Sequence, residues 1–239
     1  MEQKAIYTPL GLAEKIELTI SYMLKFVIVF TIIMSIVKFN PFHFASGVVI
    51  LVFSALPAII GRKLRITLPV EVDLVIALFI FAHFMLGEVA DYYNRFTTFD
   101  LLLHGSSGII IGLIGFIIIY FFLYTNRIEA NPALVVVFSV SFSLAIGALW
   151  EIFEFFMDQI FGFNMQKSGL EDTMGDLIVD FIGACIVGFG AYRYLTKDEA
   201  GVIKMLVQRF IQYNVRLQIK RKERKKTRKS RISDHTGEI

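Results

Sequence analysis

Six long apolar stretches limit what this chain can fold into more than any other feature of the sequence. A membrane-spanning helix needs about 20 consecutive, mostly apolar residues. Hydrophobic residues make up 56% of the chain and charged residues 19%, against roughly 45–50% and about 25% in globular proteins. The sequence therefore predicts an all-α, polytopic membrane helix bundle of about six transmembrane helices. The expected spans are Leu18–Val37, Phe42–Ile60, Leu68–Ala90, Asp100–Tyr124, Pro132–Met157 and Asp172–Leu195.

Composition also sets the expected domain organisation. Such an apolar chain is not disordered, and Cys185 is its single cysteine, which excludes a disulfide scaffold. We expect a six-helix transmembrane domain over residues 1–195, with a polar site within 74–190. Residues 196–239 are expected to form a cytoplasmic amphipathic and polybasic tail.

The distribution of basic residues predicts the orientation. Lys and Arg are enriched on the cytoplasmic side of membrane proteins. The N-terminal segment, the loops at 61–67 and 125–131 and the tail together hold 20 of the 24 Lys and Arg, whereas the opposite loops hold Lys38, Arg95 and Lys167. With six spans, both termini lie on this basic side. We therefore expect both termini to be cytoplasmic and the loop that carries Lys167 to lie outside.

The C-terminal tail is strongly basic, with 14 Lys and Arg against 5 Asp and Glu in residues 193–239. Its first part predicts a helix on the membrane surface, and its run from Lys220 to Arg231 has nine basic residues in twelve. The run suits binding to anionic lipid, or a topology anchor with a solvated end. It lacks the aromatic residues expected of a nucleic-acid site. The helical pattern consists of Val202, Leu206, Phe210 and Leu217, with Lys204, Arg209 and Arg216 between them.

Acidic residues gather at one depth of the predicted bundle. Charges inside spans are costly and usually functional. Ten of the sixteen carboxylates in residues 1–192 lie at or near the expected outer ends of spans three to six, together with two histidines. In span order, these groups are His83, Glu88 and Asp91; Asp100 and His104; Glu151, Glu154 and Asp158; and Glu171, Asp172, Asp176 and Asp180.

Helix geometry places most of these groups on shared faces. At about 100° per residue, Asp100 and His104 lie about 40° apart, whereas Glu88 lies about 140° from His83 and fits that face less well. Polar faces at one depth avoid lipid only by facing one another, so we expect one outward-opening polar site. The same spacing aligns Glu151 with Asp158, and Asp172 with Asp176 and Asp180.

So many carboxylates cannot all stay ionised in a confined, low-dielectric space. Lys25 and Arg95 are the basic side chains expected nearby. Three solutions stay open: a bound divalent cation, protons shared among the carboxylates, or a purely structural hydrogen-bonded network. Carboxylates alone favour Mg²⁺, Ca²⁺ or Mn²⁺, while the two histidines shift the expectation toward Zn²⁺ or Mn²⁺.

Some of these residues have simpler interpretations. A lone His83 or His104 is more often a packing residue, and Glu171 and Asp172 suit helix N-termini. Asp158 suits a solvated helix end. The deeper carboxylates lack such an explanation, so they are the strongest candidates: Glu151, Glu154, Asp176 and Asp180. The glycines of spans four and six, and Ser106 and Ser107, favour close helix packing over phosphate binding or nucleophilic catalysis.

The motifs Asp100-x-x-x-His104, Glu151-x-x-Glu154 and Asp172-x-x-x-Asp176-x-x-x-Asp180 resemble those of VanZ-like multi-pass membrane proteins, and more closely those of YjdF-like bacterial inner-membrane proteins. The resemblance covers about residues 74–190. It implies a helical fold in the bacterial inner membrane and supports the choice of site residues rather than an activity. VanZ-like proteins tend to carry Gln at the position of Glu154 and Asn at that of Asp180, so this site is more acidic.

The favoured function is a metal-dependent hydrolase or transferase that acts on a lipid-linked or envelope head group. In this hypothesis His83, His104 and Asp91 serve as ligands or general acid–base groups. A proton- or ion-coupled transporter and a non-catalytic envelope-binding or sensing protein stay open as alternatives. The expected metal ligands are Asp100, Glu151, Glu154, Asp172, Asp176 and Asp180.

Overall fold

The computed structural model describes residues 11–39, 43–44, 47–48, 51, 55, 59, 69–167, 169–198, 201–212 and 214. These residues form helices and no strand. The expected span Phe42–Ile60 falls largely outside the described residues, as do the loop at 61–67 and the basic run at 220–231. The helices are α1 (Leu12–Val37), α3 (Val70–Phe81), the π-helix η1 (Ala82–Val89), α4 (Tyr92–Arg95), α5 (Phe99–Tyr124), α6 (Pro132–Phe161) and α7 (Leu170–Lys197).

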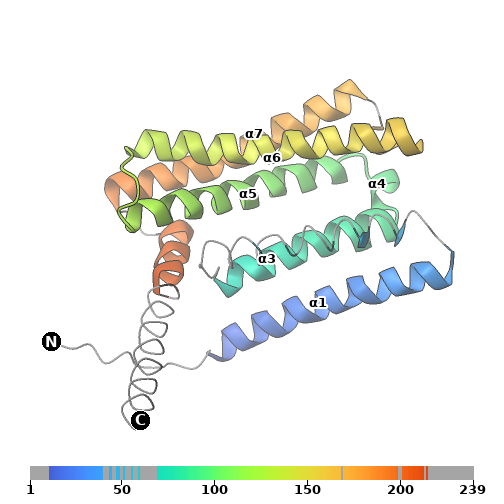
Figure 1. Ribbon diagram of the computed structural model, residues 1–239, viewed down its shortest axis with the longest axis horizontal. Helices are drawn as coiled ribbons and strands as arrows, with labels where there is room; N and C mark the ends of the chain where they lie inside the picture. The colour runs from blue at the N-terminus through green and yellow to red at the C-terminus, as the bar shows by residue number, and fades with distance from the viewer. Residues whose placement is uncertain are drawn as a thin grey trace, which may run out of the picture.

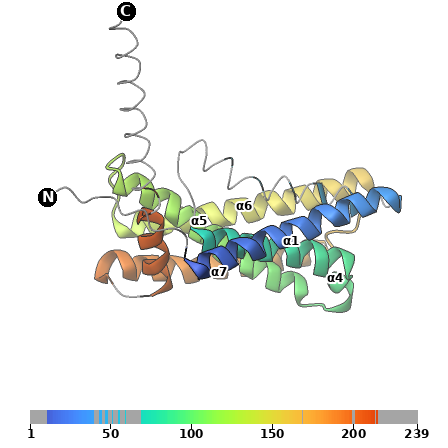
Figure 2. The same ribbon diagram turned by 90° about the horizontal axis from the view of Figure 1, so that it is seen from below.

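The helices form an elongated bundle. In Figure 1, α5, α6 and α7 lie together above α3 and α1, and all of them run along the longest axis. The short helix α4 lies at one end of the bundle, and the helix at 202–212 lies at the other, as Figure 2 shows from below. Five of the helical segments in the described part of the chain are long and apolar enough to cross a membrane. The prediction of a polytopic helical membrane bundle is therefore confirmed.

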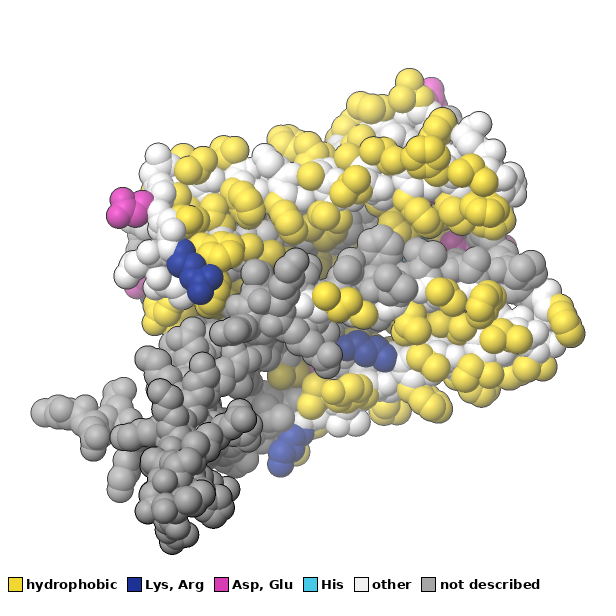
Figure 3. Space-filling view, in the orientation of Figure 1, with side chains coloured by type: hydrophobic (Ala, Val, Ile, Leu, Met, Phe, Trp, Pro, Cys, Tyr) yellow, Lys and Arg dark blue, Asp and Glu magenta, His cyan; other side chains and the backbone are white. Residues whose placement is uncertain are grey.

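The outer surface of the bundle is apolar, as expected of helices in lipid. Hydrophobic side chains cover most of the described surface in Figure 3. Phe26 of α1, Leu149 of α6 and Phe189 of α7 are 70%, 60% and 65% exposed. Such large exposed apolar side chains would be unfavourable in water, which supports their contact with hydrocarbon.

Small residues allow α5 and α7 to approach each other closely. A Cβ atom on Gly108 would collide with the backbone oxygen of Asp180, and one on Gly183 would collide with that of Gly105. Ser143 Oγ donates to the Gly108 oxygen at 3.0 Å, which links α6 to the same place. Close backbone contact of this kind is the usual role of small residues between membrane helices. It brings the polar face of α7 against that of α5.

The tail helix at 202–212 packs part of its predicted apolar face on the bundle. Leu206 and Phe210 are buried in a cluster that includes Phe121 of α5, whereas Val202 is 68% exposed. The place of this helix at the membrane surface stays a prediction. Arg209 also forms an ion pair with Glu71 of α3. The helix packs on the bundle because that arrangement buries its apolar face against other helices and pairs its arginine.

Lys25 does not accompany the acidic cluster, contrary to prediction. Its Nζ atom lies 2.8 Å from Oδ1 of Asp73, near the start of α3, and Ser21 Oγ donates to the other oxygen of Asp73 at 2.5 Å. Arg95 is exposed at the end of α4. The charge of Lys25 therefore links α1 to the start of α3, at the opposite end of the third span from His83 and Glu88.

The orientation of the bundle stays a prediction that topology reporters can check. The segments around residues 90–98 and 162–169 lie at the same end of the bundle (Figure 1). A reporter that is active only outside the cytoplasm should be active when it is fused after Lys167 and inactive when it is fused after Arg127. The reverse pattern would overturn the orientation without affecting the fold.

Candidate functional site

The π-helix η1 places two polar residues on the same side of the third span. In an α-helix Glu88 would point well away from His83. The i→i+5 hydrogen bonds of a π-helix bring residues five apart onto one side, and the bond from Ala90 N to Met85 O at 2.9 Å shows this pattern. Both His83 and Glu88 line one polar cavity. The prediction that Glu88 fits less well was therefore wrong, because it assumed regular α-helical geometry.

Tyr93, at the turn after η1, holds His83 in place. The ring of Tyr93 lies directly over Gly87, where a Cβ atom would collide with it. Burial raises the pKa of the Tyr93 phenol well above its usual value, and the charges of Asp100 and Glu88 raise it further. The phenol therefore keeps its proton, and its oxygen is hydrogen-bonded to His83 Nδ1 at 2.5 Å.

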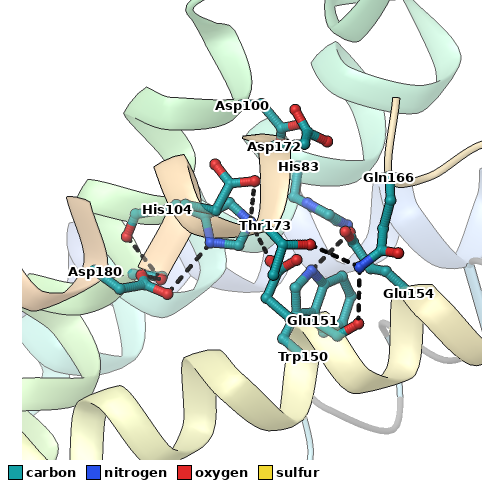
Figure 4. A network of polar contacts seen from close by, with 12 residues as sticks. His83, Asp100, His104, Trp150, Glu151, Glu154, Gln166, Asp172, Thr173 and Asp180 are labelled. Carbon is teal, nitrogen blue, oxygen red and sulfur yellow. Dashed lines mark hydrogen bonds and ion pairs between the residues drawn. The ribbon is translucent and has the colours of Figure 1, made fainter. Parts of the chain in front are cut away.

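His104 is the centre of the acidic cluster, as Figure 4 shows. It lies on α5 and is 7% exposed. Its Nδ1 atom is 3.3 Å from Oδ2 of Asp180, and its Nε2 atom is 3.7 Å from Oε1 of Glu151 and 4.0 Å from Oδ2 of Asp176. Three carboxylates from two other helices thus surround one imidazole.

Asp180 fixes the orientation of the His104 imidazole through its Nδ1 atom. Its Oδ2 atom faces His104 Nδ1, and its Oδ1 atom accepts a hydrogen bond from Ser107 Oγ at 2.7 Å. The close approach of α5 and α7 at Gly108 brings Asp180 within reach of both groups. A histidine whose Nδ1 donates to a carboxylate presents a free lone pair on Nε2. In that state Nε2 is directed toward Glu151 and Asp176.

Glu151 is the least satisfied member of the cluster. It is 4% exposed, and within the described part of the chain neither of its carboxylate oxygens has a hydrogen bond of good geometry, although Thr173 and Gln166 lie beside it. A buried carboxylate without a hydrogen bond carries a large desolvation cost. One donor atom each from His104, Glu151 and Asp176 lies within 4.8 Å of the other two. This geometry could hold a metal ion.

A second group of carboxylates adjoins the first. Asp100, Asp172 and Asp176 also bring one oxygen each within 4.8 Å of the others, so Asp176 belongs to both groups. Lys167 reaches this group from the connection between α6 and α7: its Nζ lies 3.1 Å from Asp100 Oδ2, and its backbone N donates to Asp172 at 3.1 Å. Among the described residues, Lys167, rather than Lys25 or Arg95, is therefore the lysine or arginine that pairs with the cluster.

The remaining candidates lie outside these two groups. Glu154 is 7% exposed and accepts a hydrogen bond from Trp150 Nε1 at 2.9 Å. Asp91 adopts a left-handed conformation with φ 63° and accepts from Asn94 Nδ2 at 2.6 Å. Asp158 accepts from two backbone N–H groups of the following loop, so it organises a helix end. Neither Asp91 nor Asp158 contacts His104 in the described structure.

Two adjoining cavities open beside the cluster. The first has a volume of about 260 Å³ and a polar lining that includes Glu88, Asp91 and Glu154. The second has a volume of about 380 Å³ and a mainly apolar lining, with His104 and Asp180 at one side. His83 and Asp100 line both cavities.

Local sequence patterns contain little signal for the partners Lys167, Tyr93 and Trp150. The sequence predicts Lys167 only as a charge in an outer loop, and no sequence pattern singles out Tyr93. A pattern search along single helices cannot detect Lys167 or Tyr93, because their partners lie on other elements. Trp150 lies one turn before Glu154 on α6, but nothing in that spacing marks it as a hydrogen-bond donor.

Comparison with known proteins links the chain to a membrane protein family. The model of the DUF2238 family, described as predicted membrane proteins, matches residues 19–197. An uncharacterised protein of Thermotoga maritima is 31% identical over 134 residues, which make up 54% of this chain and 66% of that relative, just under two thirds of its length. No solved structure matches. These matches support an uncharacterised multi-pass membrane family, while the YjdF-like and VanZ-like resemblance stays a prediction.

Proposed function

Because the chain belongs to the DUF2238 family of predicted membrane proteins, and the matched residues 19–197 include the whole acidic cluster, we propose that it is a membrane protein with a divalent-metal site. His104, Glu151 and Asp176 would hold the ion. The site would act on a lipid-linked or envelope head group. The observation that carries this proposal is the buried Glu151 carboxylate, which has no hydrogen bond of good geometry to the described residues and lies beside His104 Nε2.

The surroundings of His104 suit a metal ligand. Metal-binding histidines commonly donate their other ring N–H to a carboxylate, which fixes the ring and raises its basicity. Asp180 occupies that position at Nδ1, and Ser107 in turn holds Asp180. With Nδ1–H directed at Asp180, Nε2 faces Glu151 and Asp176 with its lone pair. An ion between the three groups would offset the repulsion of that lone pair by the two carboxylates.

The spacing of the donors also suits an ion. Tetrahedral donors about 2.0–2.2 Å from a metal lie roughly 3.3–3.6 Å apart, and the measured separations from His104 Nε2 are 3.7 and 4.0 Å. A small inward shift would complete the coordination. One imidazole and two carboxylates favour Zn²⁺ or Mn²⁺ over Mg²⁺ or Ca²⁺.

Three protein ligands leave a coordination position for water or for an oxygen of the substrate. A metal bound there would lower the pKa of that water or polarise a phosphoryl or carbonyl oxygen. His83 lines both adjoining cavities, which suits a general acid–base role toward a head group. Asp100 and Asp172 extend the acidic surface from Asp176 and could hold a second ion.

A proton-coupled carrier is the second candidate. The same geometry suits a protonated His104 that pairs with Glu151, Asp176 and Asp180 without a metal. Transport also needs a polar path to the other end of the bundle. In the described structure, Phe116 and Val135 are fully buried in an apolar cluster between the site and that end, so we favour the metal site.

Metal analysis of the purified protein tests the proposal. We expect the wild-type chain to retain one divalent ion, and Glu151→Gln and Asp176→Asn to retain at least tenfold less because each removes an ionised ligand. Glu171→Gln, at an exposed position in the first turn of α7, is the matched control and should retain wild-type metal.

The results separate the three candidate functions. Equal and negligible metal in all four proteins, also after loading with Zn²⁺ or Mn²⁺, would remove the metal site. Flux in proteoliposomes that follows a proton gradient would then favour the carrier. If neither metal nor flux is found, but Glu151→Gln abolishes a cell-envelope phenotype, a binding or sensing function moves ahead.

A further inference from the structure

The two cavities beside the acidic cluster form one amphipathic site. Each is lined by His83 and Asp100, so the polar and apolar spaces meet at these two side chains. The apolar cavity, about 380 Å³, falls within the range of roughly 300–1,000 Å³ typical of ligand pockets. A ligand that fills both spaces must have a polar end and a hydrocarbon end.

The apolar cavity lies between α3, α5 and α6. Its walls include Ile80, Ile111, Ile146, Leu149 and Trp150. Leu149 is 60% exposed on the surface that faces lipid, so one wall of the cavity reaches that surface. A hydrocarbon chain could therefore enter sideways from the bilayer while its head group stays at the end of the bundle.

The polar cavity is rich in acidic groups. Four carboxylates line it, from Glu88, Asp91, Asp100 and Glu154, together with the ammonium group of Lys167 and the imidazoles of His43 and His83. An anionic head group would meet these carboxylates at close range, which is unfavourable in a partly buried space. A cationic head group would be attracted by them.

Lys167 shows how this cavity accommodates an ammonium group. Its Nζ atom lies 3.1 Å from Asp100 Oδ2 and 4.9 Å from the centre of the Tyr93 ring. A carboxylate combined with an aromatic face is a favourable environment for an organic cation. The same surfaces would hold an amine presented by a ligand.

We propose that the site binds a membrane amphiphile whose head group carries a positively charged amine and whose hydrocarbon chain occupies the cavity lined by Ile111 and Trp150. The amine lies among the carboxylates of the polar cavity, in competition with Lys167. This inference rests on the proposed function for its premise that the ligand comes from the membrane. It does not require the metal, so the two can fail separately.

Trp150 provides a direct probe, because it is the single tryptophan of the chain and lines the apolar cavity. The test uses the full polypeptide in detergent after treatment with EDTA. The ligand is an amphiphile with a dodecyl chain that is brominated near its end, since bromine quenches tryptophan fluorescence on contact. Three head groups are compared: ammonium, phosphate and hydroxyl. We expect the ammonium form to quench Trp150 at a concentration on the order of tenfold below the other two, equivalent to one additional favourable charge contact.

Three variants separate the site from general partition into the micelle. Ile111→Phe should weaken quenching by filling the cavity, whereas Ile109→Phe, on the same helix at a position 40% exposed, should leave it unchanged. Lys167→Met should strengthen quenching by the amine, because it removes the competing ammonium group.

Several results would overturn the inference. Equal quenching by all three head groups would mean that the hydrocarbon chain of the ligand alone determines binding. Equal effects of Ile111→Phe and Ile109→Phe would show that the hydrocarbon chain does not occupy the cavity lined by Ile111. A preference for phosphate that appears with added Zn²⁺ and disappears with EDTA would assign the head group to the metal instead. Persistence of the amine preference in Asp176→Asn would support the inference even if no metal binds.

Discussion

Replacement of His104 by alanine should destabilise the metal-free protein by about 3–5 kcal/mol, the cost of removing one partner from a buried ion pair. Without a metal, His104 is expected to be protonated, and among the described residues it then pairs with Glu151, Asp176 and Asp180. Its loss leaves these buried carboxylates to repel one another. Thermal unfolding in detergent with EDTA should show a midpoint lower by roughly 6–20 °C.

Two further variants distinguish charge from packing in this experiment. His83→Ala removes an imidazole of the same size that is hydrogen-bonded to Tyr93, and it should cost clearly less. The double variant His104→Ala with Asp176→Asn should recover part of the lost stability, because one carboxylate charge is removed. Equal losses for the two histidines, or no recovery in the double variant, would show that His104 serves mainly to fill space.

Gly108→Ala should destabilise the bundle by about 1–3 kcal/mol through overpacking, although alanine is the better helix former by up to about 1 kcal/mol. Its Cβ would collide with the backbone oxygen of Asp180, and a backbone cannot rotate away as a side chain can. The unfolding midpoint should fall by roughly 2–12 °C. Because Asp180 also orients His104, metal retention should fall with it.

Gly105→Ala is the matched control, one turn earlier on the same helix. A Cβ there would lie 3.7 Å from Val179 Cβ, an ordinary contact. This variant should therefore be neutral or slightly more stable and keep its metal. If Gly108→Ala behaves in the same way, the close contact between α5 and α7 does not determine the position of Asp180.

The long helices could be predicted because their apolar runs and end signals are local. Asn131 and Pro132 begin α6: the Asn131 side chain accepts from Leu134 N at 2.8 Å, and Pro132 occupies the first turn. Gly162, with φ 68°, ends the same helix. The tail helix was predicted from equally local spacing, yet whether its apolar face meets lipid or protein depends on tertiary contacts that no local pattern contains.

The candidate site was predictable where regular helical spacing holds. Asp176 and Asp180 lie one turn apart on α7, and both are buried against α5 and α6, as their spacing suggested. Glu88 could not be placed, since nothing in the local sequence indicated a π-helix. Lys167 could not be recognised as the basic partner, because it approaches Asp100 from a loop that is 67 residues away in sequence.

The π-helix η1 also affects how the sequences of related proteins should be aligned. A π-helix contains one residue more than the α-helix that would cover the same turn, and one residue corresponds to about 100° of rotation. A homologue that lacks this additional residue would keep a span of nearly the same length and hydrophobicity. It would nevertheless bring a different side chain into the place of Glu88, so ligand preference within the family can diverge through a single deletion that leaves every other chemical group intact.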